Sequence, residues 1–308
     1  MKKISVQAFA KINLSIDVKG VLANGYHIVE MVMQQISLCD NVHISWKETD
    51  EDIFEINLSS GRDDLPDDSG NLAYRAAALM GELYPHNGKV TIEIEKNIPV
   101  AAGLAGGSSN CAAVIHGLNH LWGLGLSINE LNEIGAKLGA DVSFCSMGQA
   151  AASDSLKATF ADDPMASHCA LATGTGTELI PLKGLEAHIA LSKPDLAVST
   201  AEVYKGIDSI SIPARPDNQA LILALKEQNT ENIYANMINV LENYTLVMYP
   251  NVMYTKDKMH DLNSNRPVLM SGSGPTVFAV CETAEQAEHI REQLKNVNRE
   301  SYRVKTTR

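Results

Sequence analysis

The sequence predicts an α+β protein of two domains. The length of 308 residues slightly favours two domains over one. Residues 90–122 have the pattern of a strand, a glycine-rich turn and a helix. The second half has the pattern of a strand, two or three helices, two strands and a final helix, which is typical of a small α+β domain. We expect the domains to cover residues 1–178 and 179–308.

The chain begins with strand-like segments. Residues 3–18 predict two successive strands with Lys11-Ile12-Asn13 at their junction, because apolar and polar residues alternate there. Asn24-Gly25 then indicates a turn. A helix is predicted from near Asn71 to Leu83. Further strands are predicted at 28–36, 42–46, 53–58 and 90–96.

Helical segments follow the glycine-rich turn. Ser127-Ile-Asn-Glu130 has the pattern of a capping box, so a short helix should begin there and end at Gly139. This places Asp141 in the turn after that helix. Residues 151–169 show no clear period, which predicts an insertion or a long loop. The second half predicts strands at 187–193, near Val268 and at 276–281, and helices at 217–226, 229–248, 251–263 and 284–294.

The glycine-rich segment from Pro99 to Asn110 predicts a phosphate-binding site. Its three glycines let backbone N–H groups converge on one point, because no Cβ blocks close approach. Ser108 and Ser109 add hydroxyl donors, and we expect them to cap the following helix at its positive N-terminal end. For this segment alone, a tight strand-to-helix turn without a ligand is an equal alternative.

Charge and composition argue against several functions. The net charge is −12, which argues against a broad basic surface for nucleic acid. The five cysteines are far apart and form no Cys-x-x-Cys pair, so we expect neither a disulfide framework nor structural zinc. The N-terminal apolar run is too short for a signal peptide, and no run approaches membrane-spanning length. We therefore expect a cytoplasmic protein with no membrane partner.

The glycine loop lacks the lysine of a P-loop, and the sequence has no dinucleotide fingerprint and no protein-kinase motif. The glycine loop resembles instead the Pro-x-x-x-Gly-Leu-Gly/Ala-Gly-Ser-Ser signature of the GHMP kinases, the superfamily of galactokinase, homoserine kinase and mevalonate kinase. Six further segments match this superfamily in order across nearly the whole chain, which is far more specific than the loop alone. They are Ala10–Ser15, Gly25–His27, Asn71–Ala77, Gly139–Phe144, Ser199–Tyr204 and Met270–Phe278.

The resemblance implies a two-domain GHMP kinase fold, with an N-terminal ATP-binding α/β domain and a smaller, ferredoxin-like C-terminal α+β domain. The active site is expected in the cleft between them. ATP and Mg²⁺ are the implied cofactors, with no metal ligand assigned in the chain. The branch of the superfamily that these segments match most closely phosphorylates the 2-hydroxyl of a cytidine diphosphate-linked methylerythritol in non-mevalonate isoprenoid biosynthesis. This small molecule is the expected partner of a monomer or weak homodimer.

The resemblance also implies roles for individual residues. Asp141 would accept the proton of the substrate hydroxyl, while Lys11 would hold that hydroxyl and a phosphate oxygen together. Without the resemblance, a strand lysine and a helix-terminal aspartate with no catalytic role would be the simpler interpretation. The residues expected at ATP are Asn71, Leu72, Lys96, Gly103, Leu104, Ala105, Gly106, Gly107, Ser108 and Ser109. Those expected at the cytidine substrate are Asn13, Tyr26, His27, Thr200 and Tyr204, and Gly272–Gly274 is expected to support the glycine loop or the phosphate.

Three positions depart from the family pattern. Ala105 replaces a glycine, Asn110 replaces an aspartate close to the expected phosphates, and Ser143 replaces a proline. Two alternatives for the function stay open. The chain could be another GHMP kinase, such as a homoserine or mevalonate kinase, or a sensor that keeps the fold and binds a metabolite without turnover.

Overall fold

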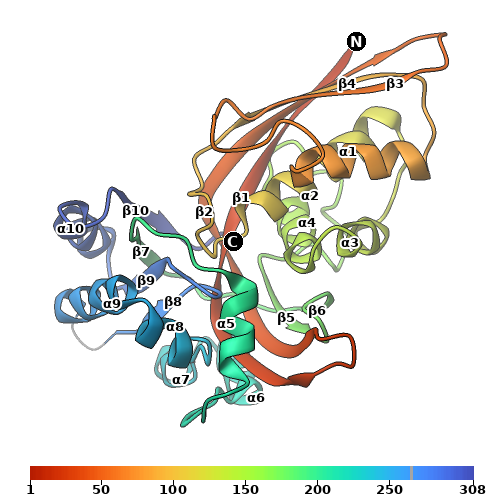
Figure 1. Cartoon of the computed structure of the whole chain (residues 1–308). Coiled ribbons are helices and arrows are strands. Elements are labelled where there is room, and N and C mark those ends of the chain that lie inside the picture. The colour runs from red at the N-terminus through yellow and green to blue at the C-terminus, as the bar shows by residue number, and fades with distance from the viewer. Residues whose placement is uncertain (264–265) are drawn as a thin grey trace. The chain divides into compact units, whose positions relative to one another are not determined.

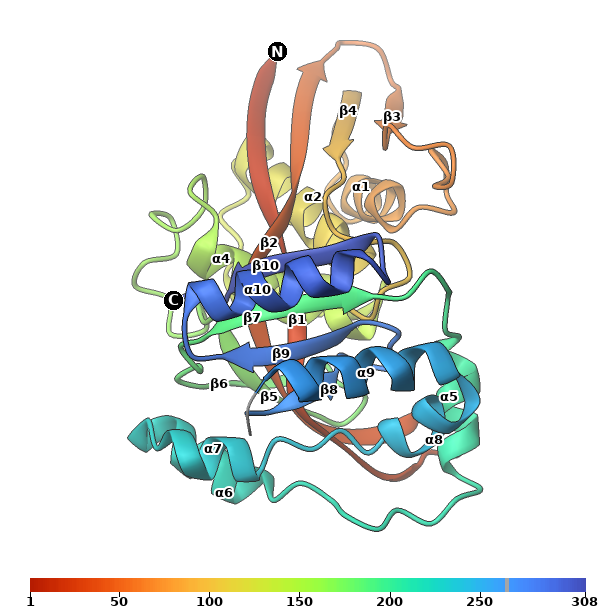
Figure 2. The same cartoon turned by 90° about the vertical axis from the view of Figure 1, so that its left-hand side faces the viewer.

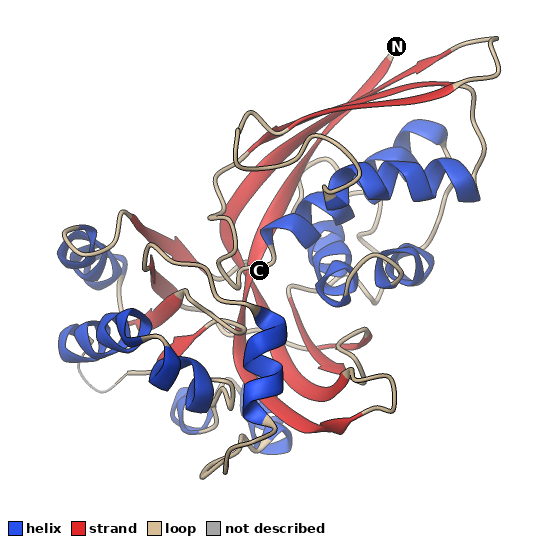
Figure 3. Cartoon of the chain, in the orientation of Figure 1, coloured by secondary structure: helices blue, strands red, loops and turns tan. Residues whose placement is uncertain are grey.

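The computed structural model describes residues 1–263 and 266–308 (Figure 1). Figure 3 distinguishes the helices and strands of the described chain from its loops. The strands are β1 (Lys2–Val21), β2 (His27–Glu48), β3 (Phe54–Ser59), β4 (Gly88–Glu95), β5 (Cys169–Thr173), β6 (Glu178–Pro181), β7 (His188–Lys193), β8 (Val268–Met270), β9 (Val277–Cys281) and β10 (Glu300–Lys305). The helices are α1 (Leu72–Leu83), α2 (Gly106–Trp122), α3 (Ile128–Ala136), α4 (Ala140–Ala152), α5 (Thr200–Ile207), α6 (Asn218–Glu227), α7 (Thr230–Ala235), α8 (Glu242–Met248), α9 (Pro250–Leu262) and α10 (Ala284–Lys295).

The chain divides into two compact units, each assembled from separate segments. β1 and β2 contribute residues to both units, and so does the glycine loop. The expected domain boundary near residue 178 divides the chain into two continuous parts, so it describes a different division and stays a prediction. Unit 1 comprises Met1–Ala10, Leu38–Ile98 and Ala105–His168, and unit 2 comprises Lys11–Ser37, Pro99–Leu104 and Cys169–Arg308.

Unit 1 combines sheet strands with helices α1 to α4. β4 pairs in parallel with β3 and antiparallel with the second half of β2. Val90, Ile92 and Ile94 are buried and alternate with more exposed residues, which confirms the strand that this alternation predicts. α2 packs closely on the sheet at Gly117, where an added Cβ would lie 2.2 Å from Ile44 Cδ1.

Unit 2 contains an antiparallel sheet in the strand order β10-β7-β9-β8. α9 and α10 lie along one face of this sheet (Figure 2). The first half of β2 pairs in the same unit with β5, and β5 pairs with β6. The α+β composition predicted for the second half is therefore confirmed, with β10 as a strand that the sequence pattern did not reveal.

Two pairs of predicted strands are single long strands in the structure. The strands expected within residues 3–18 form the continuous β1. Lys11 and Asn13 do not interrupt it, because both are buried and the Lys11 ammonium donates to Asn13 Oδ1 over 2.8 Å. The strands expected at 28–36 and 42–46 are likewise both part of β2.

Two helix predictions need correction, and one helix was not predicted. The helix expected over 229–248 is two helices, α7 and α8, because the chain between them pairs with β1: Ile16 N–H donates to Ile238 O, and Val240 N–H donates to Ile16 O. α5 was not predicted; it begins at Thr200, and the Ser199 side chain caps it by accepting from Glu202 N–H. Gly139 does not simply end α3, since it is the N-terminal flanking residue of α4, which continues to Ala152. Residues 153–168 then contain neither helix nor strand, as the missing period predicted.

Two features of the described chain concern its cysteines and its helices. All five cysteines carry free thiols. Within residues 1–263 and 266–308, no helix has both the length and the apolar character needed to cross a membrane.

Candidate active site

The first half of the glycine loop, residues 99–104, is held by a second glycine-containing loop of unit 2. Gly103 has a φ of +72°, and a Cβ added there would lie 2.3 Å from the carbonyl oxygen of Ser271. The Ser271 hydroxyl donates to the Gly103 carbonyl over 2.9 Å. Gly103 must therefore be a glycine for conformational and steric reasons. The expectation that the loop around Gly272–Gly274 supports the glycine loop is confirmed.

Lys11 lies beside this junction. Its side chain is buried, and its ammonium donates to Asn13 Oδ1, while its backbone N–H donates to Leu104 O over 3.1 Å. A Cβ on Gly272 would lie 3.4 Å from Lys11 Nζ. The ammonium is therefore next to the loop around Gly272–Gly274, which we call the supporting loop. Asn13 is fully buried, and its amide nitrogen also contacts Met31 Sδ. Within unit 2, Lys11 is thus a buried cation with a fixed direction beside the glycine loop.

α5 connects the supporting loop with the predicted cytidine residues. Near its start, the Thr200 and Ser273 hydroxyls are 2.9 Å apart. Further along, the Tyr204 ring lies 4.9 Å from the His27 ring, measured between centroids, with 46° between their planes. His27 Nε2 is 3.0 Å from Asp208 Oδ1, directly after the helix. Tyr26 is 65% exposed, which rules out a role in the core.

The second half of the glycine loop leads into α2 in unit 1. Ala105 flanks the helix in the left-handed conformation, with a φ of +58°, and no side chain caps this helix N-terminus. Gly106 begins the helix and Gly107 is exposed. Backbone N–H groups in the first turn of a helix have no partners within the helix, and they carry its partial positive charge. This end of α2 therefore has the properties of an anion site.

The expected capping by Ser108 and Ser109 is wrong. Both residues lie inside the first turn of α2, because the helix already starts at Gly106. Ser109 is fully buried: its hydroxyl donates to Phe9 O over 2.7 Å and accepts from Gln149 Nε2 over 3.0 Å. The Ser109 side chain therefore anchors α2 to β1 and α4 within unit 1, and this hydroxyl is engaged in those contacts.

Asp141 lies in a helix rather than in the predicted turn. It belongs to the first turn of α4 and is partly buried. The run of buried residues from Val142 to Ala150 continues as a helix, so the chain has no turn at this point. A carboxylate in the first turn is favoured by the helix dipole. α4 is joined to α2 through Gln149, and also through His116, whose Nε2 lies 2.9 Å from Ser146 O.

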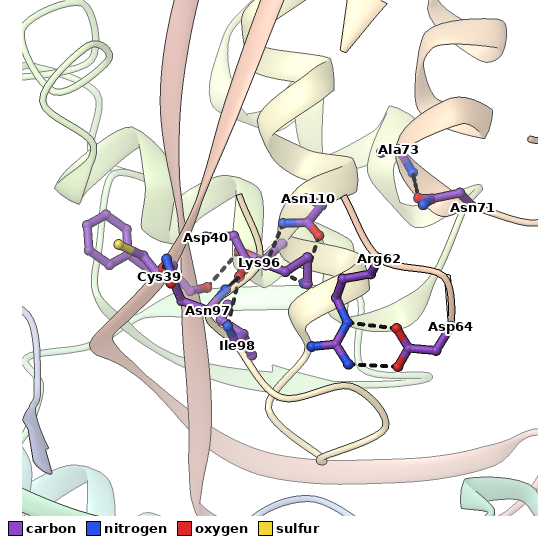
Figure 4. A network of polar contacts seen from close by, with 12 residues as sticks. Cys39, Asp40, Arg62, Asp64, Asn71, Ala73, Lys96, Asn97, Ile98 and Asn110 are labelled. Atoms are coloured by element: carbon purple, nitrogen blue, oxygen red, sulfur yellow. Dashed lines mark hydrogen bonds and ion pairs between the residues drawn. The ribbon is translucent and has the colours of Figure 1, made fainter. Parts of the chain in front are cut away.

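Three further residues expected at ATP lie in unit 1. A Cβ on Gly107 would lie 3.8 Å from Leu72 Cδ1, so Leu72 is next to the start of α2. The Asn71 side chain caps α1 by accepting from Ala73 N–H. The Lys96 ammonium pairs with Asp40 and donates to Asn110 Oδ1 (Figure 4). The polar groups of Asn71 and Lys96 are thus already engaged in intramolecular contacts.

Several residues of this region escaped sequence reasoning. Asp40 is completely buried in β2, and Asn239 Nδ2 donates to the carbonyl groups of Met270 and Gly272 over 2.8 Å each. Asp40 lies between the strands predicted at 28–36 and 42–46, and no pattern in the sequence marks it. Ser271 lies within the matching segment Met270–Phe278, but its contact with Gly103 was not predicted. Asn239 belongs to no recognisable pattern, and its partners Met270 and Gly272 are far away in sequence.

The fold belongs to a known class of proteins. The model of the GHMP kinases N terminal domain matches residues 71–149, and the model of the GHMP kinases C terminal domain matches residues 221–300. A crystal structure of a homoserine kinase from Cytophaga hutchinsonii covers 100% of the chain with a TM-score of 0.69 at 18% identity, which is a likeness of fold alone. The fold predicted from the resemblance is confirmed.

More similar proteins narrow this class. A 4-diphosphocytidyl-2-C-methyl-D-erythritol kinase from Clostridioides difficile is 44% identical over 100% of this chain and 96% of its own length. One from Bacillus licheniformis is 43% identical over 98% of this chain and 96% of its own length. A crystal structure of 4-(cytidine 5'-diphospho)-2C-methyl-D-erythritol kinase has a TM-score of 0.78 and 27% identity, and covers 99% of this chain and 100% of its own. The chain belongs to the 4-diphosphocytidyl-2-C-methyl-D-erythritol kinase family of GHMP kinases.

Proposed function

We propose that the protein transfers the γ-phosphoryl group of ATP to the 2-hydroxyl of 4-diphosphocytidyl-2-C-methyl-D-erythritol, a step of non-mevalonate isoprenoid biosynthesis. The observation that carries this proposal is the buried Lys11 ammonium, which is oriented by Asn13 and lies beside the glycine loop and its supporting loop. The chain is 44% and 42% identical, over nearly its full length, to two kinases named for this substrate, and this similarity supports the choice of acceptor. A cytoplasmic location and a monomeric or weakly dimeric state stay predictions.

The proposed reaction is a direct in-line transfer. The Asp141 carboxylate accepts the proton of the 2-hydroxyl as its oxygen forms the new bond to the γ-phosphorus. The bond from that phosphorus to the bridging oxygen breaks, and ADP leaves with the electron pair. Lys11 stabilises the negative charge on the transferring oxygens and holds the acceptor near them. Lys11 lies in unit 2 and Asp141 in unit 1, and their joint action is part of the proposal.

The nucleotide is proposed to bind through its phosphates at the glycine loop. The uncapped N-terminus of α2 offers backbone N–H groups to an anion, and Gly106 and Gly107 leave room for close approach. Leu72 lies beside this end of the helix and would contact the base, together with the backbone near Asn71 and Lys96. The buried Ser109 would act by holding the helix.

Mg²⁺ is proposed to accompany the triphosphate. This ion keeps several waters and usually binds through phosphates with one or two carboxylates. The described residues contain no group of three or more His, Cys, Asp or Glu side chains suited to holding a metal. In this proposal ATP carries the ion to the site, and the ion neutralises the phosphate charge.

The cytidine part of the substrate is proposed to bind at His27 and Tyr204. These rings lie close together in unit 2, and exposed Tyr26 is adjacent in sequence. An aromatic ring can stack on a pyrimidine, and an imidazole can hydrogen-bond its edge. Thr200 and Asn13 would complete this site. Thr200 is already linked to Ser273 of the supporting loop.

Coupled ADP release tests the proposal. The wild-type protein should turn over 4-diphosphocytidyl-2-C-methyl-D-erythritol, and Asp141→Asn should lower kcat by about 10²–10⁴-fold, the usual contribution of a general base. Lys11→Ala should also be severely impaired. Asp162→Asn and Lys137→Ala change exposed residues of the same types and should leave turnover unchanged.

The alternatives predict different results. Preferred turnover of homoserine or mevalonate in a substrate panel would point to another GHMP kinase. Binding of the cytidine compound with no ATP consumption would point to a sensor. Normal turnover by Asp141→Asn would remove the proposed base.

A further inference from the structure

A buried carboxylate lies at the point where β4 leads into the glycine loop. Asp40, in β2, has no exposed surface. Its Oδ1 accepts from the backbone N–H groups of Asn97 and Ile98 over 2.7 and 2.8 Å. Its Oδ2 accepts from Asn110 Nδ2 over 2.8 Å and pairs with the Lys96 ammonium. Figure 4 shows these groups converging on Asp40 of β2 from α2 and from the segment directly after β4.

The four donors explain how a carboxylate can be buried here. An isolated carboxylate without partners would be strongly destabilised in a protein interior, whereas a paired and fully hydrogen-bonded one is tolerated. Lys96 also donates to Asn110 Oδ1 over 3.0 Å, so Asp40, Lys96 and Asn110 contact one another in a closed triangle. The triangle has one negative charge, one positive charge and one neutral amide.

The triangle fixes the start of α2. Asn110 lies in this helix, four residues after Gly106, and binds Asp40 directly. Lys96 reaches Gly106 itself, since a Cβ on Gly106 would lie 3.4 Å from Lys96 Nζ. The backbone contacts of Asp40 hold the segment immediately before Pro99. One side chain therefore anchors both the entry to the glycine loop and the first turn of α2.

We propose that Asp40, Lys96 and Asn110 are positioning residues that hold the backbone N–H groups at the start of α2 in the geometry that binds the phosphates of ATP. This inference rests on the proposed function, because it takes that helix end as the phosphate site. In this proposal the three side chains act on the phosphates through the backbone of Gly106 and Gly107, which they hold in place.

The triangle also explains why residue 110 is an asparagine. Its amide is both the donor to Asp40 and the acceptor from Lys96, and a carboxylate cannot act as the donor. An acidic residue at this position would bring a second negative charge within hydrogen-bond distance of Asp40, with one ammonium to balance both. Asn110, which departs from the family pattern, thus satisfies both members of the buried pair in this chain.

A charge-swap experiment tests the triangle. Asn110→Asp and Asp40→Asn are made separately and together, and KM is measured for ATP and for the cytidine substrate. Each single variant should raise KM for ATP about tenfold, equal to 1.4 kcal/mol of binding. KM for the cytidine substrate should change much less. The double variant restores one carboxylate and one amide around Lys96, and should recover most of the ATP affinity.

Binding of a non-hydrolysable ATP analogue provides a second readout, through the rise in Tm that it causes. Asn119→Asp is the matched control, because it makes the same change at the other end of α2, where Asn119 Oδ1 accepts from Leu126 N–H. The control should lower Tm without changing KM for ATP.

The outcomes separate the two proposals. A wild-type protein that neither binds nor consumes ATP would overturn the proposed function itself. An active wild type whose folded single variants keep a normal KM for ATP would overturn the positioning role alone. If the single variants do not fold, the double variant decides: a folded protein with restored ATP affinity supports the triangle, and one without it refutes the triangle.

Discussion

The two halves of the glycine loop are held by different kinds of interaction. Residues 99–104 are fixed in unit 2 by backbone and hydroxyl contacts, above all between Gly103 and Ser271. Residues 105–110 are fixed in unit 1 by a buried ion pair, with Asp40 and Lys96 bound to Asn110. The first arrangement leaves no room for an additional atom, and the second requires each charge to keep its partner. The first half should therefore be destabilised by substitutions that add atoms, and the second half by substitutions that remove one of the paired charges.

The largest loss of stability is expected from Asp40→Ala. It leaves the Lys96 ammonium buried without its counter-ion and removes the acceptor of two backbone N–H groups. Breaking a buried pair in this way should lower the free energy of unfolding by about 3–5 kcal/mol, as measured in urea. The exposed pair between Arg62 and Asp64 is a natural control, because Asp64→Ala should have little effect. Equal losses in the two variants would show that the buried pair of Asp40 and Lys96 contributes no more to stability than an exposed pair.

A smaller loss is expected from Gly103→Ala. The added methyl would lie 2.3 Å from Ser271 O and 2.8 Å from Gly274 O, at a φ that side chains rarely adopt. Overpacking and backbone strain should together cost about 2–3 kcal/mol, measured as a fall in Tm. No charge is altered, so this loss should be the same at low and high salt. A salt-dependent loss would show that the first half is also held by charges.

Acid should destabilise the protein through His116, which is buried in α2 of unit 1 and contacts Ser146 of α4. Burial lowers the pKa of His116 from 6.5 to about 4. The unfolded chain therefore binds a proton at this residue before the folded protein does, and the stability it contributes is lost as the pH falls from 6.5 towards 4. The difference in unfolding free energy between wild type and His116→Gln should narrow over this range. A constant difference would mean that His116 keeps an ordinary pKa in the folded protein.

The smallest change in stability is expected from Gly107→Ala. The nearest atom to the added methyl would be Leu72 Cδ1 at 3.8 Å, which is an ordinary contact distance. The backbone of Gly107 is already helical. Alanine is a better helix former than glycine by about 0.5–1 kcal/mol, so Tm should stay the same or rise slightly. KM for ATP, measured on the same variant, then reports how closely the phosphates approach this residue. A fall in Tm comparable to that of Gly103→Ala would show that the two halves of the glycine loop are equally sensitive to an added methyl group.

The sequence revealed those parts of the fold that depend on neighbouring residues. Val90, Ile92 and Ile94 predicted β4 because alternation along a strand follows directly from its geometry. The Ser127 capping box predicted the start of α3, and both of its hydrogen bonds are present. The resemblance of the motifs predicted the family, which the relatives confirm. The roles of Lys11 and Asp141 stay predictions.

Other features depended on partners far along the chain. The break between α7 and α8 arises because Ile238 and Val240 pair with Ile16 of β1. Ser109 was expected at a helix cap, but its hydroxyl is taken by Phe9 O, a hundred residues earlier. Asp40 gave no sign of its importance, because its partners Lys96 and Asn110 are 56 and 70 residues away.

The sequence by itself determined the order of most strands and helices, the glycine loop and the family, because periodicity, capping and motif spacing are local properties. Only the tertiary structure decided which side chains hold that loop in place. A buried carboxylate such as Asp40 is stable only where donors from separate segments meet it, and that meeting is a consequence of folding.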